Sequence, residues 1–118
     1  MKNITTYVGV DAHKKDLFIA MLIGDHTTPV TWHLANEPNA VRRLVRTLER
    51  EAPGPVRMCY EAGPCGYALQ RQVRTARVSC QVIAPALIPR KPGDRIKTNR
   101  RDARKLAELA RAGLLTAV

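Results

Sequence analysis

A chain of 118 residues has the size of a single domain, and its 45% of apolar residues are enough to form a core. Only 4% of the residues are aromatic, so the core must be aliphatic, and an extensive aromatic surface for stacking single-stranded bases is excluded. The net charge of +10 favours a polyanionic partner such as nucleic acid.

The first third of the chain predicts three strands. Ile4–Val10 is rich in β-branched residues and ends at Asp11, Leu17–Ile23 is a second apolar run, and Val30–Leu34 is a short third one. Short polar turns separate these runs, which is typical of an antiparallel meander.

Helices and strands alternate in the rest of the chain. Asn36 and Pro38 suit the cap and first turn of a helix, whose apolar residues recur at helical spacing at Val41, Leu44, Val45 and Leu48. The segments that follow are predicted as strand, helix, strand, linker and helix: Val56–Tyr60, Tyr67–Ala76, Val78–Ala84, about 85–98, and Arg100–Ala112. The order β-β-β-α-β-α-β-α over residues 1–118 predicts one α/β domain, with a five-stranded mixed sheet and helices on both faces.

Two acidic residues close predicted strands. Asp11 ends the first strand and Glu61 ends the fourth, although an ionised carboxylate is costly beside an apolar strand unless it is solvated, paired or bound to metal. If these strands are parallel neighbours, both carboxylates emerge at the sheet edge where open α/β sheets place ligands. Each acid could instead serve only its turn.

A third acid, Asp102, opens the last predicted helix. With Asn99 as N-cap, Asp102 could simply complete a capping box. It also precedes Leu106 and Leu109 by four and seven residues, so it shares their inward side. Oxygen ligands converging there would suit Mg²⁺ or Mn²⁺, and paired ions of this kind assist phosphodiester displacement.

Basic residues are concentrated late in the chain. Residues 90–105 contain eight basic and two acidic side chains, a distribution better explained by phosphate contacts than by solvation alone. Lys14 and Lys15 follow Asp11 and are further candidates. The predicted nucleic-acid contacts are therefore Lys14, Lys15, Arg90, Lys91, Arg95, Lys97, Arg100, Arg101, Arg104 and Lys105.

Three segments resemble successive blocks of one family. Residues 8–14 (VGVDAHK), 60–67 (YEAGPCGY) and 97–104 (KTNRRDAR) are similar, in order and spacing, to blocks of the IS-one-ten family of insertion-sequence transposases. The resemblance covers essentially the whole chain. It implies a ribonuclease H-like fold of the RuvC type, carrying a DEDD set of acids that binds metal and performs catalysis.

The resemblance assigns catalytic and metal-binding roles residue by residue. Asp11, Glu61 and Asp102 match three of the four acids, whereas the remaining one falls at Asn99, whose neutral amide is a weaker ligand. Asp94 is nearby but out of register. The sequence thus departs from a full four-acid set.

The resemblance also implies partners. Members of the family act on the DNA of element ends and target, use a structured RNA that bridges them, and continue into a domain with a nucleophilic serine. The present chain stops before such a domain, so we expect it to bind nucleic acid and Mg²⁺ but not to recombine DNA alone, and we expect a homo-oligomer in the full-length protein. Cysteines without CxxC spacing, the lack of an apolar run near the ~20 residues of a membrane span, and no signal-peptide core predict a cytoplasmic protein without a membrane partner.

Other interpretations remain open. The same fold and metal chemistry would serve a resolvase-type, structure-specific nuclease, and a domain without a working metal site would be a non-catalytic nucleic-acid-binding module. A sugar-kinase or actin-like ATPase is disfavoured, because Ala12 and His13 stand where that fold needs glycines beside phosphate. His13 could contact phosphate or merely stabilise its turn, and Cys65 and Tyr67 have packing as the simpler explanation.

Overall fold

The computed structural model describes residues 4–63, 66–75, 77–84 and 99–117, and for residues 99–101 only the backbone. The predicted linker at 85–98 lies outside these ranges, as do Arg90, Lys91, Asp94, Arg95 and Lys97. Across the described ranges, no helix is both long and apolar enough to cross a bilayer.

One mixed sheet forms the centre of the molecule. Its strands are β1 (Thr6–Ala12), β2 (Asp16–Ile23), β3 (Val30–Ala35), β4 (Val56–Glu61) and β5 (Val78–Ile83). They lie in the order β3-β2-β1-β4-β5, with β1, β2 and β3 antiparallel and β1, β4 and β5 parallel. The predicted meander and the predicted mixed sheet are both confirmed. The arrangement is compatible with a ribonuclease H-like fold.

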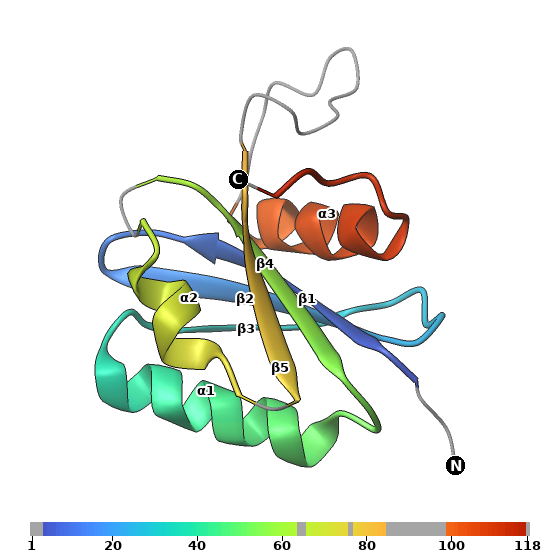
Figure 1. Cartoon of the computed structure of the whole chain (residues 1–118), viewed down its shortest axis with the longest axis horizontal. Coiled ribbons are helices and arrows are strands. Elements are labelled where there is room, and N and C mark those ends of the chain that lie inside the picture. Colours follow the sequence, from blue (N-terminus) through green and yellow to red (C-terminus); the bar gives the residue numbers. More distant parts are fainter. Residues whose placement is uncertain (1–3, 64–65, 76, 85–98, 118) are drawn as a thin grey trace.

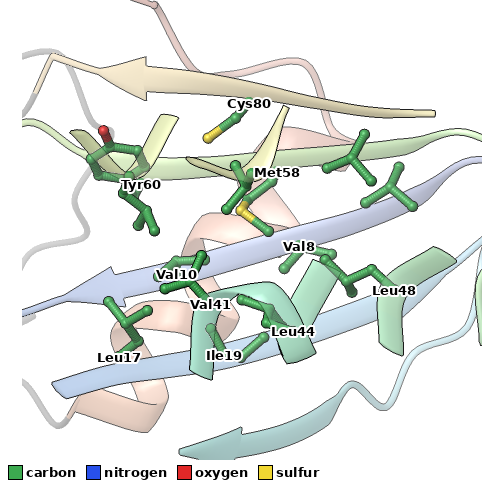
Figure 2. Close-up of a cluster of buried hydrophobic side chains, with 14 of the residues drawn as sticks. Val8, Val10, Leu17, Ile19, Val41, Leu44, Leu48, Met58, Tyr60 and Cys80 are labelled. Carbon is green, nitrogen blue, oxygen red and sulfur yellow. The ribbon is translucent and has the colours of Figure 1, made fainter. Parts of the chain in front are cut away.

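One face of the sheet carries the main core under α1 (Pro38–Glu51) and α2 (Ala68–Val73) (Figure 1). Val41, Leu44 and Leu48 of α1 pack on alternate side chains of the strands, as Figure 2 shows for Val8, Val10, Leu17, Ile19, Met58, Tyr60 and Cys80. Leu69 and Val73 of α2 are buried in the same cluster, as predicted. The cluster on this face is aliphatic apart from Tyr60, the sulfur-containing side chains and the partly buried Trp32 that packs against it.

The opposite face is covered by α3 (Asn99–Arg111). The helix approaches the sheet closely, because a Cβ on Gly9 of β1 would lie only 2.1 Å from the carbonyl oxygen of Ala103 and 2.6 Å from the backbone nitrogen of Ala107. A glycine inside a strand often marks such an approach of another backbone. Gly113, with φ of 73°, follows the end of the helix, as predicted.

Two details of the predicted helices are wrong. Asn36 does not cap α1: the N-cap is Glu37, which makes no side-chain capping bond, and Asn36 instead donates from Nδ2 to the His13 carbonyl at 2.9 Å. This bond ties the start of α1 to the β1–β2 turn. The second helix covers only Ala68–Val73, shorter than the predicted Tyr67–Ala76, because Tyr67 is its N-cap and Arg74 already has an extended backbone.

Arg77, just before β5, completes the end of α1. Its guanidinium donates to the carbonyls of Glu49 and Ala52 at 2.7 Å each and of Gly54 at 2.9 Å. The last carbonyls of a helix have no partner within it, so another group must satisfy them. A side chain from a distant part of the chain does so here.

Candidate active site

Asp11 and Glu61 lie side by side at one end of the sheet. In the parallel pair of β1 and β4, Val10 is opposite Tyr60, and each acid is the next residue along its strand. Both carboxyl-bearing residues therefore emerge at the carboxyl ends of neighbouring parallel strands, the position at which α/β sheets bind ligands. The parallel arrangement predicted from the two strand ends is present.

Both acids belong to the face covered by α3. Side chains alternate between the faces of a strand, and Gly9 and Cys59, two residues before the acids, contact α3. Asp11 and Glu61 consequently point to that same side, and both are half-buried, with 17% of the Asp11 side chain exposed. A half-buried carboxylate keeps enough access to bind a cation or a phosphate-bound metal.

Asp102 is in the first turn of α3, at the same end of the molecule. The opposite end of the helix is fixed by Arg111, which donates to the carbonyl of Gly24 at 3.4 Å, just after β2. Because Thr6 at the start of β1 pairs with Ile23, that end of α3 lies near the beginning of β1. The first turn of α3 therefore lies towards the end of β1, and Asp102 is half-buried there.

The three acids nevertheless do not form a compact cluster. Within the described ranges, no three His, Cys, Asp or Glu side chains are grouped closely enough to hold a metal ion. The side chain of Asn99 and the whole of Asp94 lie outside the described part of the chain. The donors thus fit Mg²⁺ in chemistry and in the end of the sheet that they share, but not in mutual spacing.

His13 is the immediate partner of Asp11. Its Nε2 lies 3.0 Å from Asp11 Oδ2, and its side chain is 45% exposed. The contact orients the carboxylate from the turn that follows β1. Asn36 holds the backbone of that turn from the start of α1, so both faces of the sheet contribute to placing Asp11.

A second histidine, His33 on β3, was not a sequence candidate. Its ring stacks on Phe18 of β2 with centroids 4.6 Å apart and planes 16° apart, and its Nε2 is 2.9 Å from Asp16 Oδ1. His13 meets the other side of the same array, edge-on to Phe18 at 5.9 Å. Strand register places His33 opposite Phe18, and register is not readable from residue types.

Lys14 and Lys15 are exposed in the turn beside Asp11. On α3, Arg104 is exposed and pairs with Glu108 at 3.1 Å, while Lys105 is half-buried. The backbone of Arg100 and Arg101 belongs to the first turn of α3, but their side chains are not among those that the structure describes. The other predicted contacts, Arg90, Lys91, Arg95 and Lys97, lie wholly outside the described residues. Among described residues, basic side chains thus flank the acids from the β1–β2 turn and from α3.

The two described cysteines are buried and free. Burial raises the pKa of Cys59 to about 12, with a smaller effect from Cys80, and burial likewise raises the pKa of Cys80 to about 12 against the opposing charge of Arg74. Both thiols stay neutral near pH 7, so neither is a nucleophile. Cys65 lies outside the described residues.

Two curated relatives are transposases by name. The chain is 46% identical over 114 residues to "Putative transposase y4qE" of Sinorhizobium fredii, a match over 95% of this chain and 29% of that protein. It is 36% identical over 107 residues to the transposase for insertion sequence element IS1533 of Leptospira borgpetersenii, over 90% of this chain and 31% of that protein. The chain therefore spans about three tenths of the length of these relatives. No family model matches it.

Proposed function

We propose that this domain supplies the acidic residues of the catalytic centre of a DNA transposase that moves an insertion sequence. The observation that carries the proposal is the placement of Asp11 and Glu61 on adjacent parallel strands, on the face covered by α3, in a chain similar to two transposases. A RuvC-like form of the ribonuclease H-like fold and membership of the IS-one-ten family are the finer parts of this proposal.

The residues proposed to bind Mg²⁺ or Mn²⁺ are Asp11, Glu61 and Asp102, with Asn99 as a neutral fourth ligand. Because the three acids are not grouped closely enough in the described arrangement, Asp102 must move towards the strand ends for all of them to reach one ion. Such an ion stabilises the negative charge that develops on phosphate oxygens during strand cleavage and transfer. The protein's own contribution is to position the carboxylates: His13 orients Asp11, and the close packing of α3 over Gly9 brings Asp102 towards the strand ends.

The basic residues around this end would bind the DNA backbone. Lys14 and Lys15 stand on one side of the acids and α3 on the other, and phosphate contacts of this kind hold nucleic acid without reading its sequence. In the longer proteins to which this chain is similar, we propose that a second domain completes the centre, and that a structured RNA and further copies of the protein take part. The domain alone then binds DNA and metal without exchanging strands.

Metal-dependent stabilisation of the 118-residue protein tests the proposal. Mg²⁺ or Mn²⁺ should raise the melting temperature, because a ligand at about 100 times its Kd adds ~2.7 kcal/mol to the free energy of unfolding. Asp11→Asn should abolish the rise. Asp25→Asn is the matched control and should leave the rise intact. Asp25 is exposed in the β2–β3 turn, at the opposite end of the sheet from Asp11 and Glu61. An equal rise in wild type and Asp11→Asn would refute the metal site.

A non-catalytic nucleic-acid-binding role is the second candidate. It is favoured by one observation, that no three metal-binding side chains among the described residues are grouped together. In that case DNA binding would persist in wild type and in Asp11→Asn alike, and neither metal would change the melting temperature of wild type.

A further inference from the structure

A row of side chains crosses the sheet and leads to the proposed catalytic acids. Phe18 is opposite both Asp11 and His33 in the strand register, and Glu61 is the next residue after the paired Tyr60 on the far side of β1. The row on the face of α3 is therefore His33, Phe18, Asp11 and Glu61, one residue from each of β3, β2, β1 and β4.

The outer end of this row lies beyond the helix. α3 packs on β1, β2 and β4, and the buried cluster between helix and sheet includes Ala20 and Leu22 of β2 with Phe18 at its border. On β3, His33 remains 52% exposed at its side chain. One face of its imidazole lies on Phe18, and its edge is bonded to Asp16, so the ring has a fixed orientation.

We propose that His33, backed by Phe18, is a stacking platform for one unpaired base of the DNA strand that lies over Asp11 and Glu61. The inference rests on the proposed function and adds a substrate contact to that same site. Aromatic and histidine rings bind unpaired bases through their π-faces, without preference for sequence. A low aromatic content excludes an extended stacking surface but not a single platform.

Distance and charge both fit a DNA strand. Neighbouring strands are about 4.8 Å apart, so His33 is two spacings, or ~10 Å, from Asp11. Because Phe18 covers the inner face of the His33 ring, a base would stack on the outer face, ~3.4 Å farther from Asp11. With successive phosphates of a stacked strand ~3.4 Å apart along its axis, that base would be about four nucleotides from a phosphate at the acids. Lys14 and Lys15 are exposed in the turn between β1 and β2, the two strands that carry Asp11 and Phe18. They can bind the phosphates in between.

The experiment uses a single-stranded DNA oligonucleotide carrying one 2-aminopurine, whose fluorescence falls when the base stacks. In EDTA, binding to the 118-residue protein should quench the fluorophore, and His33→Ala should weaken binding about 5- to 100-fold and remove the quench. His33→Phe should restore both, because it keeps a flat ring on Phe18. His26→Ala is the matched control at an exposed histidine in the β2–β3 turn, and it should bind as wild type does.

The outcomes separate this inference from the proposed function. If His33→Ala binds and quenches like wild type while Asp11→Asn still loses its metal-induced rise in melting temperature, the platform is refuted and the metal site stands. Tighter binding and stronger quenching with the matching RNA strand would overturn the assignment to DNA. If wild type binds no oligonucleotide, both proposals fail.

Discussion

The two faces of the sheet are built in different ways. Under α1 and α2, the buried side chains form one continuous, mainly aliphatic cluster that includes residues from Val8 to Val82. Under α3, the buried residues form two small clusters separated by the backbone contact at Gly9, and alanines replace the large side chains of the other face. The first face holds the domain together, and the second sets how near a helix carrying Asp102 comes to the strands carrying Asp11 and Glu61.

The largest expected effect is on the face of α1. Leu48 is fully buried, so Leu48→Ala should lower the free energy of unfolding by about 2–5 kcal/mol through lost burial and a cavity. Urea denaturation measures this loss. Because the acids lie on the other face, Mg²⁺ should still raise the melting temperature of Leu48→Ala, although that temperature is lower than in wild type. A variant that loses its metal response while still folded would show that the two faces are not separable.

A smaller loss of stability should have the larger consequence for the site. Gly9→Ala places a Cβ against two backbone atoms of α3, so the helix must shift, at a cost of about 1–3 kcal/mol. We expect the metal response to disappear with that shift. Gly63→Ala is the matched control, since a Cβ there meets no atom nearer than 4.0 Å, and it should change neither quantity. A crystal structure of Gly9→Ala with α3 in its original place would contradict the claim that Gly9 sets the distance between α3 and the strands that carry the acids.

The smallest effect concerns the Cys80 thiol, which is buried in the core under α1 and α2. The pKa of Cys80 is about 12 in the folded protein and near 8.5 when the thiol is exposed in the unfolded chain. The stabilisation that results is fully present below about pH 8.5. As the pH rises towards 12, the free energy of unfolding falls by up to ~1.4 kcal/mol per pH unit. In a Cys65→Ser background, Cys80→Ala should show a shallower fall in stability between about pH 8 and about pH 10. An equal fall would mean that the thiol ionises freely in the native state.

The sequence predicted the fold better than it predicted the site. The spacing of apolar residues was enough to predict five strands and three helices, because the buried face of each element requires apolar side chains at the spacing of a strand or of a helix. Asn36 was misassigned, since a residue suited to capping can bond any nearby carbonyl, and only the fold brings His13 within reach. The acids at the two strand ends could be located, but their separation from Asp102 depends on the packing of α3.

His33 and Phe18 could not have been found from residue types. Their contact depends on the register of β2 against β3, which the turn between them sets. Gly9, by contrast, carried a usable signal: a glycine between two valines inside a strand indicates another backbone close by.

The bonds of Arg77 have a consequence for how the molecule assembles. The guanidinium of Arg77, just before β5, donates to the carbonyl of Glu49 in the last helical turn and to those of Ala52 and Gly54 just after it. We therefore expect the end of the helix and the strand to open together. An excised α1 peptide would fray at this end. In the intact domain, hydrogen exchange at the last turn of α1 should follow the opening of β5 rather than local unwinding of the helix.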